Sequence, residues 1–179
     1  MDRKEFLRGC AGGLCACAAA ACLPGVAGAA DAAKPEDWRL PFVKQRYAKL
    51  LEILAQRMGE DGASQALQDL GSFCASQHDE ATVKFRGDVE GYRKFVGGHG
   101  STVAYDAGRR VYTTTYDPGG HCPCPFAGEA GKTPGLMCDC SVGWVRHSWT
   151  IVLGREPKVA LKETLLRGGK VCSFEVTPA

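Results

Sequence analysis

The sequence predicts an α+β fold: a single domain in which N-terminal helices pack on an antiparallel sheet of two hairpins, with one late helix between the hairpins. Three observations lead to this prediction. Apolar residues recur at three- and four-residue steps before residue 97, segments rich in Val, Thr and Tyr flank glycine turns after residue 100, and one further helical pattern separates these segments.

The first thirty residues are predicted to be an export signal rather than part of the fold. Residues 2–8 (DRKEFLR) precede a weakly apolar run of Ala, Gly and Cys, and Ala27-Gly28-Ala29 suits cleavage near Ala30. The segment resembles a twin-arginine signal, with Lys4 in place of the second arginine. This resemblance implies recognition by export machinery and a periplasmic or other extracytoplasmic location.

The same segment has two alternative interpretations, a membrane anchor and a lipoprotein signal. Pro24 and several glycines interrupt the run, so no stable transmembrane span is expected after cleavage. A lipoprotein that begins at Cys17 or Cys22 stays an alternative.

Residues 31–179 are expected to form the domain, with a cysteine-rich loop at residues 121–140. The whole chain has 22 basic and 20 acidic side chains and a net charge of +2, so no nucleic-acid surface is implied. Of the ten cysteines, six lie after residue 30. An even number of cysteines in an exported protein is compatible with disulfides.

The helices are predicted from apolar periodicity. One helix is expected over Pro41–Met58, ending at Gly59, a second over Ser64–Gln77, and a third from Val89, stopped by the glycine-rich loop at 97–100. Cys74 falls on the buried stripe of the second helix, where a core thiol is the simplest interpretation.

The strands follow. Residues 101–106 and 110–117 predict the first hairpin, and residues 158–166 and 170–176 predict the second. Between them, Ser141 is expected to cap a helix that runs to Leu153 and is ended by Gly154.

The chemistry is concentrated in the cysteine-rich loop. Cys122-Pro-Cys124 and Cys138-Asp-Cys140 are joined by a Gly/Pro-containing segment, and Cys172 lies on the last predicted strand. Zinc binds four ligands in a tetrahedron, and two thiolate pairs could supply them; four thiolates would also suit an Fe–S cluster. Disulfides and free reactive thiols are the alternatives.

An enzyme would need a nucleophile and a base near a pocket. Cys122 or Cys124 could be the nucleophile and His121 or His147 the base, oriented by Asp139 or Glu163.

The late helix also offers pocket residues. Trp144 and His147 lie on one stripe with Cys140, and the helical rise from residue 140 to residue 147, about 10.5 Å, is too long for both side chains to bind one ion. We therefore expect Trp144 and His147 to line a pocket rather than bind metal.

The order of Cys140, Gly143-Trp144, Glu163, Gly168-Gly169 and Cys172-Ser173-Phe174-Glu175-Val176 resembles the 4-vinyl-reductase-like small-molecule-binding domains and the related L-2-amino-thiazoline-4-carboxylic acid hydrolase family. The resemblance covers about residues 100–177.

The resemblance implies an apolar ligand pocket between helices and sheet and, in some members, a zinc site. Its ligands are a cysteine before the last helix, a glutamate on the penultimate strand and two later cysteines. Cys138 or Cys140, Glu163 and Cys172 match three of these positions, while Leu166 stands near the fourth. Cys122 or Cys124 would then have to supply the missing thiolate.

Together these observations predict an exported small-molecule-binding domain with a cysteine-rich site, of zinc or less readily an Fe–S cluster, beside an apolar pocket. The candidate metal ligands are Cys122, Cys124, Cys138, Cys140, Cys172 and Glu163. Two alternatives stay open: a small hydrolase that acts on a cyclic C–N substrate through a cysteine or a metal-bound water, and a disulfide-stapled envelope protein without catalysis.

Overall fold

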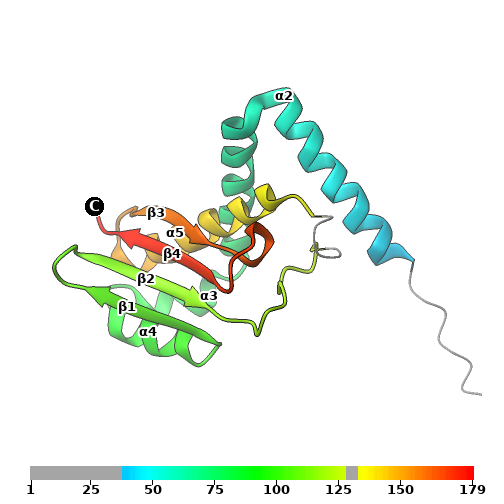
Figure 1. The fold of residues 1–179 in the computed structure, drawn as a ribbon. Coiled ribbons are helices and arrows are strands. Elements are labelled where there is room, and N and C mark those ends of the chain that lie inside the picture. Colours follow the sequence, from blue (N-terminus) through cyan, green and yellow to red (C-terminus); the bar gives the residue numbers. More distant parts are fainter. Residues whose placement is uncertain (1–37, 128–132) are drawn as a thin grey trace, which may run out of the picture. The chain divides into compact units, whose positions relative to one another are not determined.

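The computed structural model describes residues 38–127 and 133–179 (Figure 1). The export signal predicted at residues 1–30 lies outside the described residues. The architecture is α+β, as predicted, with helices and a four-stranded antiparallel sheet of strand order β1-β2-β4-β3. None of the described helices is both long and apolar enough to cross a membrane.

Both predicted hairpins form. The first is β1 (Ser101–Asp106) with β2 (Val111–Tyr116), and the second is β3 (Lys158–Glu163) with β4 (Cys172–Thr177). Strands β2 and β4 pair in the middle of the sheet and join the hairpins. β3 ends three residues earlier than predicted, because the chain turns into the short 3₁₀ helix η3 (Leu165–Arg167).

The first two predicted helices form one interrupted helix, α2 (Arg39–Ser76), with a sharp bend at Gly59 (Figure 1). Gly59 has φ 75° and ψ 167°, a conformation that glycine adopts far more readily than other residues. The predicted break is therefore confirmed. The second segment begins directly after Gly59 rather than at Ser64. We call residues 39–58 the first arm and residues 60–76 the second arm.

Three short helices connect α2 to the sheet. They are α3 (Asp79–Thr82), the 3₁₀ turn η1 (Val83–Phe85) and α4 (Val89–Gly97). Only α4 was predicted, since α3 and η1 are too short to show a periodic pattern.

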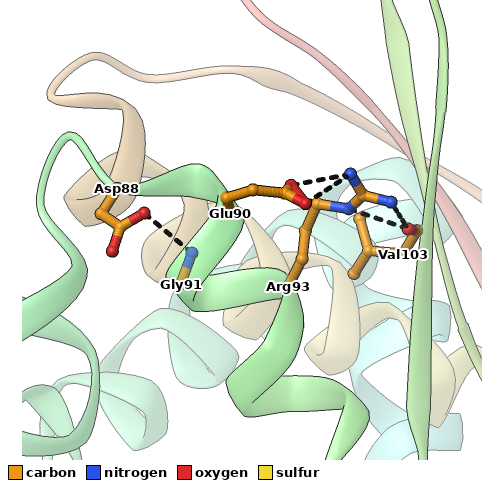
Figure 2. Close-up of polar contacts among 5 residues, drawn as sticks. All are labelled: Asp88, Glu90, Gly91, Arg93 and Val103. Carbon is orange, nitrogen blue, oxygen red and sulfur yellow. Dashed lines mark hydrogen bonds and ion pairs between the residues drawn. The ribbon is translucent and has the colours of Figure 1, made fainter.

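Polar contacts fix α4 against the edge of the sheet (Figure 2). The Asp88 carboxylate accepts the Gly91 N–H at 2.8 Å and caps the helix. Arg93 donates two hydrogen bonds to the Val103 carbonyl of the edge strand β1, at 3.0 and 2.8 Å, and also pairs with Glu90. The guanidinium thus occupies an acceptor that an edge strand would otherwise leave open.

Helix α5 (Asp139–Leu153) begins three residues earlier than predicted. The prediction that Ser141 caps it was wrong: the N-cap is Cys138, and no side chain caps the helix. The reason is that the 3₁₀ helix η2 (Gly135–Cys138) runs directly into α5, so the backbone is already helical upstream of Ser141. Gly154 ends α5 in the left-handed conformation, as predicted.

Helices α4 and α5 cover one face of the sheet. Along β4, Phe174 and Val176 are buried on this face, whereas Glu175 lies on the other and pairs with Arg109 and Lys162. Trp149 of α5 is nearly fully buried. The buried core at this interface consists of Tyr92, Val103, Trp149, Val152 and Val176.

The second arm of α2 packs on α5 at unusually short range. A Cβ added to Gly71 would lie 1.7 Å from the Cys140 carbonyl oxygen, and one added to Gly143 would lie 1.8 Å from the Gln68 carbonyl oxygen. Ser72 Oγ donates to the Gly143 carbonyl at 3.2 Å. The backbones of the two antiparallel helices therefore touch, which only glycine at both positions permits.

We expect Gly71→Ala to lower the free energy of unfolding by about 3 kcal/mol, because its methyl group would overlap backbone that cannot move independently. Gly97→Ala is the matched control: it lies in α4, has nothing within 4 Å of the added Cβ, and should change stability by no more than about 1 kcal/mol. Urea unfolding measures both. Equal effects of the two substitutions would contradict the close crossing.

Candidate functional site

The first part of the site is built at the start of β4. Cys172 pairs with Tyr116 across the sheet, so the cysteine-rich loop leaves the end of β2 beside Cys172. Burial is the main cause that raises the pKa of the Cys172 thiol. A hydrogen bond with the Leu165 backbone lowers this pKa, whereas the neighbouring Cys122 thiol and Glu163 carboxylate raise it. Cys122 and Glu163 therefore both lie within electrostatic range of Cys172.

Cys138, at the end of η2, lies within electrostatic range of Cys122 and Cys172. It is 8% exposed, and burial is the main cause that raises the pKa of its thiol. The Thr164 hydroxyl and Arg167 lower this pKa, while the Cys122 and Cys172 thiols raise it. Three thiols from three separate segments thus interact with one another. We call Cys122, Cys138 and Cys172 the β4 thiol group.

Glu163 supplies a carboxylate at the edge of this group. It ends β3, and its Oε1 accepts the Lys170 N–H at 2.5 Å. A Cβ on Gly169 would lie 2.2 Å from the Glu163 Cγ, so the side chain can fold over this turn only because residue 169 is glycine. The turn thus holds Glu163 on the side of Cys172.

Thr164 adds a buried polar atom. The side chain is 2% exposed, and its Oγ1 has no hydrogen-bond partner of ordinary length within the described residues, although it lies close enough to Cys138 to lower the pKa of that thiol. A buried hydroxyl without a hydrogen-bond partner lowers the stability of the fold. Here it leaves an O–H donor available to a nearby sulfur.

The remaining three thiols, Cys74, Cys124 and Cys140, lie within electrostatic range of one another, since Cys74 and Cys124 both act on Cys140, and we call them the helix thiol group. Burial raises the pKa of Cys140 to about 11, with further increases from Cys124, Cys138 and Cys74 and an opposing effect of Ser141. Cys124 and Cys140 pack against an apolar cluster that contains Leu51, Leu67, Ala127 and Met137.

The two groups adjoin each other, because Cys122 packs against the same apolar cluster as Cys124 and Cys140, and the Cys138 thiol acts on the Cys140 thiol. All six cysteines of the described segments carry free thiols. No three or more His, Cys, Asp or Glu side chains in these segments are already arranged so that they could hold a metal ion. Metal binding at either group would therefore require the sulfurs to draw together.

Two pockets flank Arg167, whose guanidinium donates to Asp139 at 2.6 Å and to the Gly135 carbonyl at 3.1 Å. The smaller, of about 280 Å³, opens beside Glu163, Thr164 and the turn that follows them.

The larger pocket, of about 570 Å³, lies at the bend of α2. Leu51 and Leu136 in its wall also belong to the apolar cluster behind the thiols. Its lining is mixed rather than apolar. The carboxylates that contribute are Glu52, Glu60, Asp61 and Asp139.

The predicted pocket and catalytic residues of α5 lie elsewhere. His147 Nε2 is 2.8 Å from Asp79 Oδ1, so its partner is neither Asp139 nor Glu163, and Asp139 pairs with Arg167 instead. Trp144 is 40% exposed and contacts the ring of His78. Neither Trp144 nor His147 lines the two pockets above.

The other candidate base, His121, is exposed, and its Nδ1 lies 3.3 Å from the Gly119 carbonyl. Among the hydrogen bonds and ion pairs recorded for the described residues, none joins His121 or His147 to a cysteine. The cysteine–histidine pair stays a prediction.

The pKa of Cys140 gives a testable pH dependence. The folded state holds this thiol proton more tightly than the unfolded state, whose pKa is near 9, so the stabilisation is complete below that value and is lost as the pH rises towards about 11. We expect a loss on the order of 2 kcal/mol.

Urea unfolding with reductant at about pH 8 and about pH 10.5 would measure this loss, and Cys140→Ser should reduce it. An unchanged pH dependence in Cys140→Ser would contradict the assignment.

No family model matches the chain, and no curated protein sequence matches it. Among solved structures, it is similar to the crystal structure of a trafficking protein particle complex subunit 3 from Naegleria fowleri covalently bound to palmitic acid. The two are 16% identical with a TM-score of 0.45, over 76% of this chain and 95% of that one.

Proposed function

We propose that the chain is an exported small-molecule-binding protein in which the β4 thiol group and Glu163 hold one zinc ion. The observation that carries the proposal is the convergence of three thiols and one carboxylate from separate segments: the loop after β2, the end of η2, the end of β3 and the start of β4. Sulfur and carboxylate ligands of this number suit tetrahedral zinc.

The electrostatics of the group support the same conclusion. Burial is the main cause that raises the pKa of the Cys138 and Cys172 thiols, and neighbouring thiols raise both further because thiolates repel one another. A divalent cation would neutralise this repulsion and displace the thiol protons. The buried Thr164 hydroxyl would then have a charged sulfur to donate to.

The resemblance to the 4-vinyl-reductase-like and L-2-amino-thiazoline-4-carboxylic acid hydrolase-like families supports the ligand set. It places a cysteine before the last helix, a glutamate on the penultimate strand and a cysteine on the last strand, and these positions correspond to Cys138, Glu163 and Cys172. Cys122 would replace the thiolate that is missing at Leu166.

The larger pocket is the best candidate for the ligand. Its volume of about 570 Å³ falls within the range usual for small-molecule sites. Asp139 lines it and directly follows Cys138, so the ligand would bind beside the metal. The carboxylates of the lining outnumber its single Arg167, which favours a ligand with positive charge.

Elemental analysis of the full chain, purified with reductant and without added metal or chelator, tests the metal. We expect about one zinc per chain in the wild type and a marked loss in Cys138→Ser and in Cys172→Ser, since each removes a thiolate ligand. Glu163→Gln should weaken zinc binding less.

Cys74→Ser is the matched control and should keep its zinc, because Cys74 lies outside the β4 thiol group; circular dichroism would verify that each variant is folded. Zinc content that is insensitive to Cys138 and Cys172 would refute the site. Reactive thiols without any metal would instead favour the thiol hydrolase.

A further inference from the structure

We propose that the outer face of the first arm of α2 is a docking surface for bilayers of anionic phospholipid. This face, which we call the arm stripe, consists of six exposed residues: Trp38 at the N-cap, Phe42, Arg46, Lys49, Ile53 and Arg57. The inference concerns neither thiol group and does not depend on the proposed zinc site.

The spacing of these residues places them on one side of the helix. Each follows the previous one by three or four residues, so at about 3.6 residues per turn all six lie within an arc of about 100°. The rings of Trp38 and Phe42 lie 5.7 Å apart, and the Arg46 guanidinium lies 5.1 Å from the centroid of the Phe42 ring. Aromatic and cationic groups therefore adjoin on one continuous surface.

The opposite face of the first arm attaches it to the domain. Leu51 is fully buried, and Tyr47 packs against the apolar cluster that Leu51 forms with Leu67 and Met137. The Tyr47 ring also lies 4.8 Å from that of Phe126. Because these contacts hold the inner face against the domain, the arm stripe is directed towards the solvent.

The apolar members of the stripe are well exposed. Within the described residues, seven of the thirteen exposed large hydrophobic side chains lie between Trp38 and Met58. Trp38 is 68% exposed, Phe42 45% and Ile53 42%. Apolar groups concentrated on one short segment indicate a surface that a partner or a membrane covers.

The charge of the arm indicates the partner. Residues 39–58 contain five basic side chains and one acidic side chain, a net charge of +4, whereas the whole chain carries +2. The acidic side chain, Glu52, pairs with Lys49 at 2.6 Å, and no ion pair of the described residues involves Arg46 or Arg57. Positive charge among apolar groups complements a bilayer with negative headgroups.

The same features disfavour two other occupants. A second copy of the chain would bring two positive stripes together, and like charges repel. A nucleic acid would neutralise the basic groups but offers no apolar layer for Ile53. A bilayer interface accommodates both kinds of group, because Trp lies at the level of the headgroups while Arg and Lys extend to the phosphates.

The test measures binding of the full chain to sedimented vesicles, made either of phosphatidylglycerol with phosphatidylcholine or of phosphatidylcholine alone. We expect the wild type to bind the anionic vesicles at least about tenfold more tightly and to be released at high salt. Residues 1–37 are the same in every variant, so differences between variants report on the arm.

Arg46→Gln combined with Arg57→Gln should weaken binding to anionic vesicles by about 30-fold, since each basic side chain at such a surface contributes roughly fivefold. Arg155→Gln combined with Lys158→Gln is the matched control. It removes the same charge from exposed positions outside the arm and should change binding by less than about threefold.

Phe42→Ser tests the apolar contribution and should weaken binding by about tenfold. Phe73→Ser, which replaces a 61% exposed phenylalanine on the second arm, should leave binding unchanged. Circular dichroism would verify that each variant is folded.

Vesicle binding that is equal in the wild type and in the Arg46 and Arg57 double variant would overturn the proposal. So would a wild type that ignores anionic vesicles and instead binds a DNA oligonucleotide or forms a dimer in analytical ultracentrifugation. A wild type without zinc that still binds vesicles through Arg46 and Arg57 would refute the proposed function and leave this inference standing.

Discussion

The contact between the backbones of α2 and α5 is the constraint on which the rest of the structure depends. Gly71 and Gly143 remove the side chains that would separate the helices, so each meets a carbonyl of the other helix. The crossing fixes the start of α5 and, with it, Cys138 and Cys140. Cys122, Cys124 and Cys140 pack against the apolar cluster that contains Leu67 of the second arm.

Much of the fold could be predicted from local patterns. The break at Gly59, both hairpins and the end of α5 at Gly154 follow from residues with strong backbone preferences. The start of α5 could not, because η2 continues into it and makes the capping preference of Ser141 irrelevant. The join between β2 and β4 depends on tertiary packing, which adjacent residues do not encode.

The candidate site was predictable in its residue types and less so in its arrangement. The cysteines and Glu163 stood out by chemistry, but their division into two groups depends on how a loop and two helices meet. Cys74 was interpreted as a core thiol because periodicity records burial and not neighbours. The hydrogen bond between His147 and Asp79 joins residues 68 positions apart in the sequence, so no local pattern predicts it.

The close helix crossing at Gly71 and Gly143 also means that the cysteines and these two glycines differ in how freely they can change during evolution. A descendant chain could exchange its cysteines one by one while its backbone stayed the same. A larger residue at position 71 or at position 143 would instead force the helices apart, because each of these positions faces a backbone carbonyl of the other helix. Paired small residues, Gly-x-x-Cys on one helix facing Cys-x-x-Gly on the other, are therefore the signature by which distant relatives of this domain could be found.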